Sequence, residues 1–172
     1  KILAELRGRL EADSAHVQIR FPYFLERLAP ASGLASLLDY DCLFEASWLA
    51  GKLEVRLQMT APITTLCPCS KAISDYGAHS QRGYLTLLVK PGQDGHCQPN
   101  MIWIEELVEV AESSASAPIY PLLKRVDERK VTMQAYENPA FVEDVVRNAA
   151  VRLRADERIA GRGHDHAALP RH

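Results

Sequence analysis

Cysteine is scarce in this sequence. The 172 residues include four cysteines, at positions 42, 67, 69 and 97. Secreted domains that rely on disulfide bonds are denser and more regular in cysteine, so the composition argues against a disulfide scaffold. We therefore expect free thiols and a cytoplasmic, reducing location.

Long apolar runs and a strong charge imbalance are missing as well. No segment reaches the roughly 18 apolar residues of a membrane-spanning helix, so no membrane partner is expected. Twenty basic and 22 acidic side chains give a net charge of −2, which argues against a broad nucleic-acid-binding surface. No signal peptide is visible, and the first residue is Lys rather than Met, so we expect the true N-terminus to lie upstream.

The first half of the chain predicts mostly strands. Apolar spacing over residues 1–11 indicates the end of an amphipathic helix. Residues 16–21 then alternate between apolar and polar side chains, which predicts a strand that ends at Pro22. Another strand is expected over residues 83–90.

The clearest pattern is a predicted hairpin. Apolar and polar residues alternate over 36–48 and again over 53–63, on either side of a turn at Ala50 and Gly51. Two such strands joined by a tight turn predict an antiparallel pair with one apolar and one solvated face.

Helical periodicity dominates after residue 100. Trp103, Leu107 and Val110 indicate one helix, and residues 118–136 predict several short helical pieces. In the last predicted helix Asn138 is the cap and Pro139 fits the first turn. Its apolar stripe consists of Phe141, Val145, Ala149 and Leu153.

Strands followed by helices indicate an α+β fold, in which helices pack on one face of an antiparallel sheet. We expect one domain over residues 1–160. Residues 161–172 lack periodicity and are expected to form an irregular tail.

The segment TTLCPCSKAISDYGAHSQR, residues 64–82, places two cysteines around one proline between a predicted strand and a short helix. Helix N–H groups and the neighbouring Lys71 favour a thiolate there. A thiolate is a nucleophile or a metal ligand, and the imidazole of His79 is a natural partner around zinc or a similar ion. The alternative is that both cysteines are small buried apolar residues. Spacing alone leaves these interpretations open.

The carboxylates are less informative. Asp127 and Glu128 lie among basic residues, a pattern typical of a solvated helix face. Glu143 precedes Arg147 by one helical turn, as in an ordinary surface ion pair. The residues alone therefore indicate a thiolate–imidazole site on an α+β scaffold and no more.

Four blocks of sequence go further. They are SLLDYD (36–41), TTLCPCSKAISDYGAHSQR (64–82), LLKRVDE (122–128) and AYENPAFVEDVVR (135–147). In this order and spacing they resemble the type IB GTP cyclohydrolases, a family of the tunnelling-fold superfamily, over residues 1 to about 160. The resemblance implies a tunnelling fold and the conversion of GTP and water to 7,8-dihydroneopterin triphosphate and formate. This reaction begins tetrahydrofolate and queuosine-type biosynthesis.

The resemblance also implies a metal site. Carried over by motif, Cys67, His79 and Glu128 would bind a divalent ion, Zn²⁺ or Mn²⁺, and Cys69 would lie beside it as a supporting or alternative ligand. Glu143 would anchor the purine, because a carboxylate accepts two parallel hydrogen bonds from guanine. Cys67, His79 and Glu143 are therefore the implied catalytic residues.

The triphosphate needs cationic partners. Lys71 and Arg82 lie beside the motifs and are the expected substrate-binding residues, with Lys124 and Arg125 as further candidates. The family also implies a homotetramer or another homo-oligomer with active sites between subunits.

The ends of the chain depart from the family pattern. The upstream part of the pattern is absent, and GHDHAA (163–168) only echoes the family's C-terminal His-x-His segment. The roles of His164 and His166 stay open. These departures motivate an alternative, a catalytically inactive tunnelling-fold fragment that binds a purine or a partner.

Two further alternatives keep the cysteines but change their role. A thiol nucleophile, as in the nitrile reductases of queuosine synthesis, would require a nicotinamide-binding motif that we do not find in this sequence. A structural zinc site would require a second cysteine pair to complete four ligands.

Overall fold

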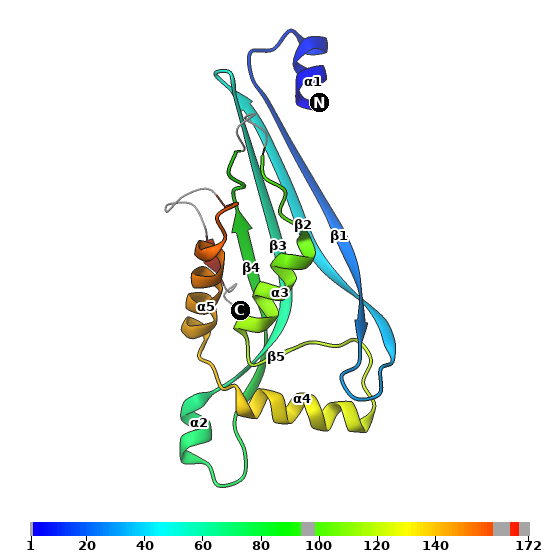
Figure 1. Ribbon diagram of the computed structural model, residues 1–172, viewed down its shortest axis with the longest axis vertical. Coiled ribbons are helices and arrows are strands. Elements are labelled where there is room, and N and C mark those ends of the chain that lie inside the picture. The colour runs from blue at the N-terminus through cyan, green and yellow to red at the C-terminus, as the bar shows by residue number, and fades with distance from the viewer. Residues whose placement is uncertain (1, 94–98, 160–165, 169–172) are drawn as a thin grey trace.

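The computed structural model describes residues 2–93, 99–159 and 166–168, and the chain folds as an α+β protein (Figure 1). The helices are α1 (Ile2–Leu10), α2 (Pro68–Ile73), α3 (Ile104–Ser114), α4 (Arg125–Glu137) and α5 (Val142–Ala155). The strands are β1 (Ala15–Leu28), β2 (Ala35–Leu49), β3 (Lys52–Leu66), β4 (Ser80–Val89), β5 (Ala117–Pro118) and β6 (His166–Ala168).

One antiparallel sheet contains all the described strands. Their order is β1-β2-β3-β4-β6, and the short β5 pairs with β3 beside this path. The predicted hairpin is confirmed as β2 and β3, with Leu49 opposite Lys52. Its turn residues Ala50 and Gly51 have φ values of 50° and 80°. Both are positive, as in the tight turns that match the twist of a hairpin.

The predicted end of the first strand at Pro22 is wrong. β1 continues through this proline to Leu28, with Pro22 opposite Asp41 of β2. β1 lies at one edge of the sheet. Alternate N–H groups of an edge strand have no neighbouring strand to bond, so proline is tolerated there.

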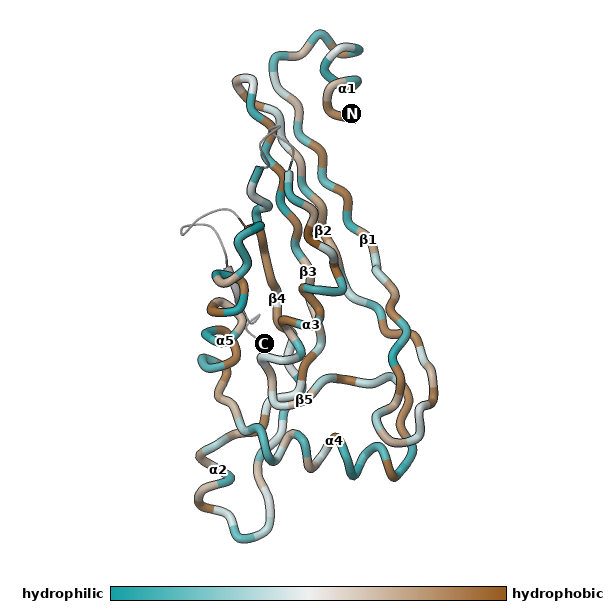
Figure 2. Tube along the Cα trace, in the orientation of Figure 1, coloured by the Kyte–Doolittle hydropathy of each residue, from teal (hydrophilic) through white to brown (hydrophobic). Residues whose placement is uncertain are grey.

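The core lies between one face of the sheet and the helices α3 and α5. Apolar and polar residues alternate along the long strands in Figure 2, and the apolar side faces these helices. The buried side chains of the sheet include Tyr40, Cys42, Met59, Ile63, Leu85 and Leu87, and those of the helices include Leu107, Val108, Val145, Ala149 and Leu153. This confirms helices on one face of the sheet.

The helical predictions need two corrections. Residues 125–137 form the single helix α4 rather than short pieces. Asn138 ends this helix, because its backbone N–H donates to the carbonyl of Gln134 (3.0 Å), and α5 begins after Phe141 instead. Propensity alone does not distinguish a residue that closes one helix from a residue that opens the next.

The apolar stripe expected in α1 is also different in the structure. Ile2, Leu6 and Leu10 are exposed, and Leu3 is the buried residue of this helix. At the other end of the chain, most of the expected irregular tail lies outside the described residues. Its described part, β6, pairs with β4.

Candidate active site

The two-cysteine motif lies where β3 ends and α2 begins. Cys67 precedes the first residue of α2, and Pro68 occupies the first helical position, where its missing N–H is not needed. Cys67 is partly buried and Cys69 is exposed. The short helix predicted after this motif is therefore confirmed, with Cys67 as its N-cap.

Local hydrogen bonds favour the thiolate form of Cys67. The backbone N–H of Ser70 lowers the pKa of this thiol; burial opposes the effect, and the N–H of Cys69 and the hydroxyl of Ser70 add to it. Cys42 shows the opposite behaviour, because burial in the core raises the pKa of its thiol to about 11. The thiol of Cys67 is thus more readily ionised than that of Cys42, which is an apolar core residue.

His79 is held beside Cys67 through the backbone. The Cys67 N–H donates to the carbonyl of His79 (2.8 Å), and the His79 N–H donates to Ser70 Oγ (2.6 Å). The loop after α2 therefore folds back on the cysteine motif. Ser70, which the sequence analysis did not single out, binds both segments, and its place three residues after the N-cap was the available signal.

Glu128 lies away from these two residues in the same chain. It is an exposed residue in the first turn of α4, whereas the C-terminal end of α4 meets α2 (Figure 1). Lys71 donates to the carbonyl of Tyr136 there, and Glu128 precedes Tyr136 by about 12 Å along the helix axis. Within the described part of the chain, no group of three or more His, Cys, Asp or Glu side chains is placed to hold a metal ion.

Asp127, next to Glu128, departs from the expected solvated helix face. Its relative exposure is 0%. Burial alone would raise the pKa of this carboxyl, but the hydrogen bonds from the Ser32 hydroxyl and from the N–H groups of Ser32, Lys124 and Ala31 hold it far below the ordinary value. Asp127 is therefore an ionised, buried carboxylate. Sequence reasoning missed it because Ala31 and Ser32, which supply three of its four hydrogen bonds, lie 96 and 95 residues earlier in the chain.

Glu143 is exposed in the first turn of α5. Its expected ion pair with Arg147 is wrong, because Arg147 pairs with Asp144 instead (2.6 Å). The Ala140 N–H, just before α5, donates to the carbonyl of Leu66 (3.0 Å), the residue that precedes Cys67. Glu143 thus lies three residues after Ala140, the residue that contacts the segment of Cys67.

The expected cationic residues occupy different surroundings. The Lys71 ammonium lies 4.2 Å from the centre of the Tyr136 ring. Arg82 lines a cavity of about 470 Å³ together with Asp39, Asp41 and Tyr120. Lys124 and Arg125 are exposed at the start of α4, near Glu128 rather than near Cys67.

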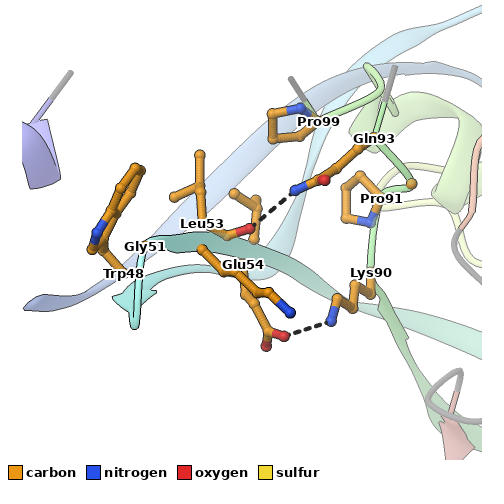
Figure 3. A pocket seen from close by; sticks show the side chains of 11 residues that line it. Trp48, Gly51, Leu53, Glu54, Lys90, Pro91, Gln93 and Pro99 are labelled. Carbon is orange, nitrogen blue, oxygen red and sulfur yellow. Dashed lines mark hydrogen bonds and ion pairs between the residues drawn. The ribbon is translucent and has the colours of Figure 1, made fainter. Parts of the chain in front are cut away.

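A larger cavity of about 700 Å³ lies at the far end of the sheet, beside the β2–β3 turn (Figure 3). Gln93 donates to the carbonyl of Leu53 (3.2 Å) across it, and Lys90 pairs with Glu54 (2.9 Å). None of the candidate catalytic or metal-binding residues lines this cavity.

Three further residues of interest lie wholly or partly outside the described residues. Cys97 and His164 lie outside the described residues, and for His166 only the backbone, opposite Leu88 of β4, is described. The helices of the described ranges are all too short or too polar to cross a membrane.

Comparisons with a family model and with individual proteins all find GTP cyclohydrolases. Residues 1–162 match the model of a family described as type I GTP cyclohydrolase folE2. A relative from Geotalea uraniireducens (strain Rf4), named GTP cyclohydrolase FolE2, is 49% identical over 158 residues, which are 92% of this chain and 55% of the relative. Proteins of the same name from Dictyoglomus thermophilum (48% over 160 residues, 93% of this chain and 59% of the relative) and Nitrosococcus oceani (44% over 160 residues, 93% and 57%) are also similar. The chain thus spans little more than half the length of these relatives.

Proposed function

Since the chain belongs to the family of type I GTP cyclohydrolases described as folE2, we propose that it converts GTP and water to 7,8-dihydroneopterin triphosphate and formate. The sequence identity of 49% over 92% of the chain to the relative from Geotalea uraniireducens is the observation that carries this proposal. The reaction would supply tetrahydrofolate or queuosine-type biosynthesis in the cytoplasm. The tunnelling fold is part of the same proposal, and the antiparallel sheet with helices on one face is consistent with it.

The donor atoms fit a divalent metal. Thiolate, imidazole and carboxylate ligands suit Zn²⁺, and the three residues Cys67, His79 and Glu128 would leave a coordination position open, as a catalytic site requires. The lowered pKa of Cys67 supports a thiolate ligand. An ion bound there would supply hydroxide at neutral pH by lowering the pKa of water from 15.7 to about 7. Cys69 is exposed beside Cys67 and is proposed as a supporting or alternative ligand.

The remaining residues bind and orient the substrate. Glu143 accepts two hydrogen bonds from the N1–H and 2-amino groups of guanine, and this charge-assisted pair selects guanine over adenine. Lys71 and Arg82 contact the triphosphate. For Lys71 this contact requires that its ammonium leave the ring and the carbonyl of Tyr136.

The metal site is completed between two copies of the chain. Cys67 and His79 lie at one end of α4 and Glu128 lies at the other end, so one chain does not bring the three side chains together. In a homotetramer or another homo-oligomer, Glu128 of one copy meets Cys67 and His79 of the next. The exposure of Glu128 and His79 leaves both side chains available for this contact.

Turnover of GTP tests the proposal. The purified chain is loaded with Mn²⁺ or Zn²⁺ and incubated with GTP or, as a control, with ATP, and the pterin product is measured by fluorescence after oxidation. We expect product from GTP alone. A folded, metal-loaded chain that binds GTP tightly and forms no product would instead be an inactive tunnelling-fold subunit that binds purines.

A further inference from the structure

Asp127 is a buried carboxylate that the proposed chemistry does not use. Its side chain is fully buried, whereas those of its neighbours Val126 and Glu128 are exposed. The structure describes every residue of α4, and among them only Asp127 and Ala135 are buried. The first turn of this helix is therefore anchored by an acid rather than by an apolar side chain.

Four donors surround this carboxylate. Oδ1 accepts from the N–H groups of Ala31 (2.8 Å) and Ser32 (2.7 Å). Oδ2 accepts from the hydroxyl of Ser32 (2.7 Å) and from the N–H of Lys124 (2.9 Å). An ionised carboxylate has about four acceptor sites, so these donors use its full capacity. Three of these bonds join the start of α4 to Ala31 and Ser32, which lie 96 and 95 residues earlier in the chain.

The segment on the other side is a closed turn between β1 and β2. The Ala29 N–H donates to the carbonyl of Leu34 (2.9 Å), and the Gly33 N–H donates to the carbonyl of Ala29 (3.0 Å). Gly33 has a φ of 68°, which glycine adopts without strain. Lys130 adds a bond from Nζ to the carbonyl of Pro30 (2.7 Å). The turn is thus a defined platform for the start of α4.

We propose that Asp127 is a positioning residue that directs Glu128 toward the metal by locking the first turn of α4 to the β1–β2 turn. Successive helical residues point about 100° apart, so an inward Asp127 turns Glu128 toward solvent and toward a second copy of the chain. The inference rests on the proposed function, which makes Glu128 a metal ligand. Loss of a residue that orients a ligand typically lowers metal affinity about 10- to 100-fold.

Metal affinity tests the proposal first. Asp127→Asn keeps the size of the side chain, but its NH₂ group does not accept from the Lys124 N–H. We expect Asp127→Asn to weaken Mn²⁺ binding, measured by electron paramagnetic resonance of the free ion, about 10- to 100-fold. Ser32→Ala removes one donor and is expected to have a smaller effect in the same direction. Wild-type affinity in Asp127→Asn would overturn the proposal.

A matched control separates positioning from general stability. Leu153→Ala opens a cavity in the core beneath α5, remote from the start of α4. It serves as the control if its Tm is equal to or lower than the Tm of Asp127→Asn; otherwise another core variant that meets this condition replaces it. We expect this variant to keep wild-type Mn²⁺ affinity. An equal loss of affinity in the core variant would mean that Asp127 acts only through stability.

Hydrogen exchange gives a readout that does not depend on metal. In Asp127→Asn we expect faster exchange in residues 29–34 and 125–128, and unchanged exchange in residues 133–137 at the other end of α4. Unchanged exchange in the first two segments would overturn the proposal even if the wild-type chain bound no metal. Absence of metal binding and turnover in the wild type, with the exchange pattern as expected, would instead count against the proposed function.

Discussion

The two ends of helix α4 are held in different ways. At the N-terminal end, the buried Asp127 accepts four hydrogen bonds and joins the helix to the β1–β2 turn. At the C-terminal end, the Lys71 side chain and the backbone bond between Ala140 and Leu66 contact the cysteine motif. The buried Ala135 of α4 also packs in an apolar cluster with Leu66. Buried charge-assisted bonds are stronger and more directional than an exposed lysine contact.

The difference indicates which of the proposed ligands depends on α4 for its orientation. Cys67 and His79 are oriented by bonds within their own segment, in particular by Ser70, and need little from α4. Glu128 stands on an exposed helical turn and has no such local support. The helix therefore carries its buried, hydrogen-bonded anchor beside Glu128.

The largest effect is expected when a proposed metal ligand is lost, either Cys67 near the C-terminal end of α4 or Glu128 at its N-terminal end. Cys67→Ala and Glu128→Gln should each lower turnover at least about a thousandfold and weaken metal binding, because two protein ligands hold the ion poorly. Metal content by mass spectrometry of the intact protein and pterin fluorescence provide the measurements. Cys42→Ala is the matched control and should retain both. Normal metal content in Cys67→Ala would contradict the ligand assignment.

Glu143 lies beyond the C-terminal end of α4, and we expect its loss to affect substrate binding and not metal binding. We expect Glu143→Gln to raise the KM for GTP about 10- to 100-fold, since an amide replaces the charge-assisted pair with weaker bonds. Metal affinity should not change. Asp144→Asn, which breaks the exposed pair with Arg147, is the control. A wild-type KM in Glu143→Gln would remove Glu143 from the substrate site.

Two lysines offer a smaller, paired test. Lys71 donates to the carbonyl of Tyr136 at one end of α4, and Lys130 donates to the carbonyl of Pro30 at the other. Because both are exposed contacts, Lys71→Met and Lys130→Met should each lower the free energy of unfolding by about 1 kcal/mol or less. Denaturant titration measures this. Only Lys71→Met should raise the KM for GTP, and equal KM values would show that Lys71 does not contact the triphosphate.

The smallest effect concerns pH. A lowered pKa leaves more of the Cys67 thiol ionised at a given pH below the ordinary thiol value of about 8.5, so metal-free Cys67 should be alkylated by iodoacetamide at lower pH than a free cysteine. Cys42, whose pKa is raised to about 11 in the core, should stay unmodified while the protein is folded. Peptide mapping distinguishes the sites. Equal rates at both cysteines would contradict this contrast.

Local features were predictable from the sequence. Alternation over residues 36–63 and the Ala50–Gly51 turn predicted the β2–β3 hairpin, and the C-P-C motif predicted a helix start with a thiolate. These features depend on neighbouring residues. The same holds for the alternation along β2, whose buried residues include Tyr40 and Cys42.

Long-range features were not predictable. Asp127 resembles any solvated acid until the β1–β2 turn, far away in the sequence, supplies its donors. Pro22 ends a strand by local rules but is tolerated because β1 lies at the edge of the sheet. The separation of Glu128 from Cys67 follows from the length and direction of α4, and no motif spacing reveals it.

The most direct test of the account is to mix two inactive variants, Cys67→Ala and Glu128→Gln. If each metal site takes Cys67 and His79 from one copy and Glu128 from another, subunit exchange regenerates intact sites. Turnover should then return to about a quarter of the wild-type value in an equimolar mixture, because random assembly of a symmetric oligomer pairs two intact halves at that frequency. The double variant Cys67→Ala/Glu128→Gln mixed with itself is the control. If subunits exchange, as shown by mass spectrometry of labelled chains, and no turnover returns, the site is not shared between copies and the account is wrong.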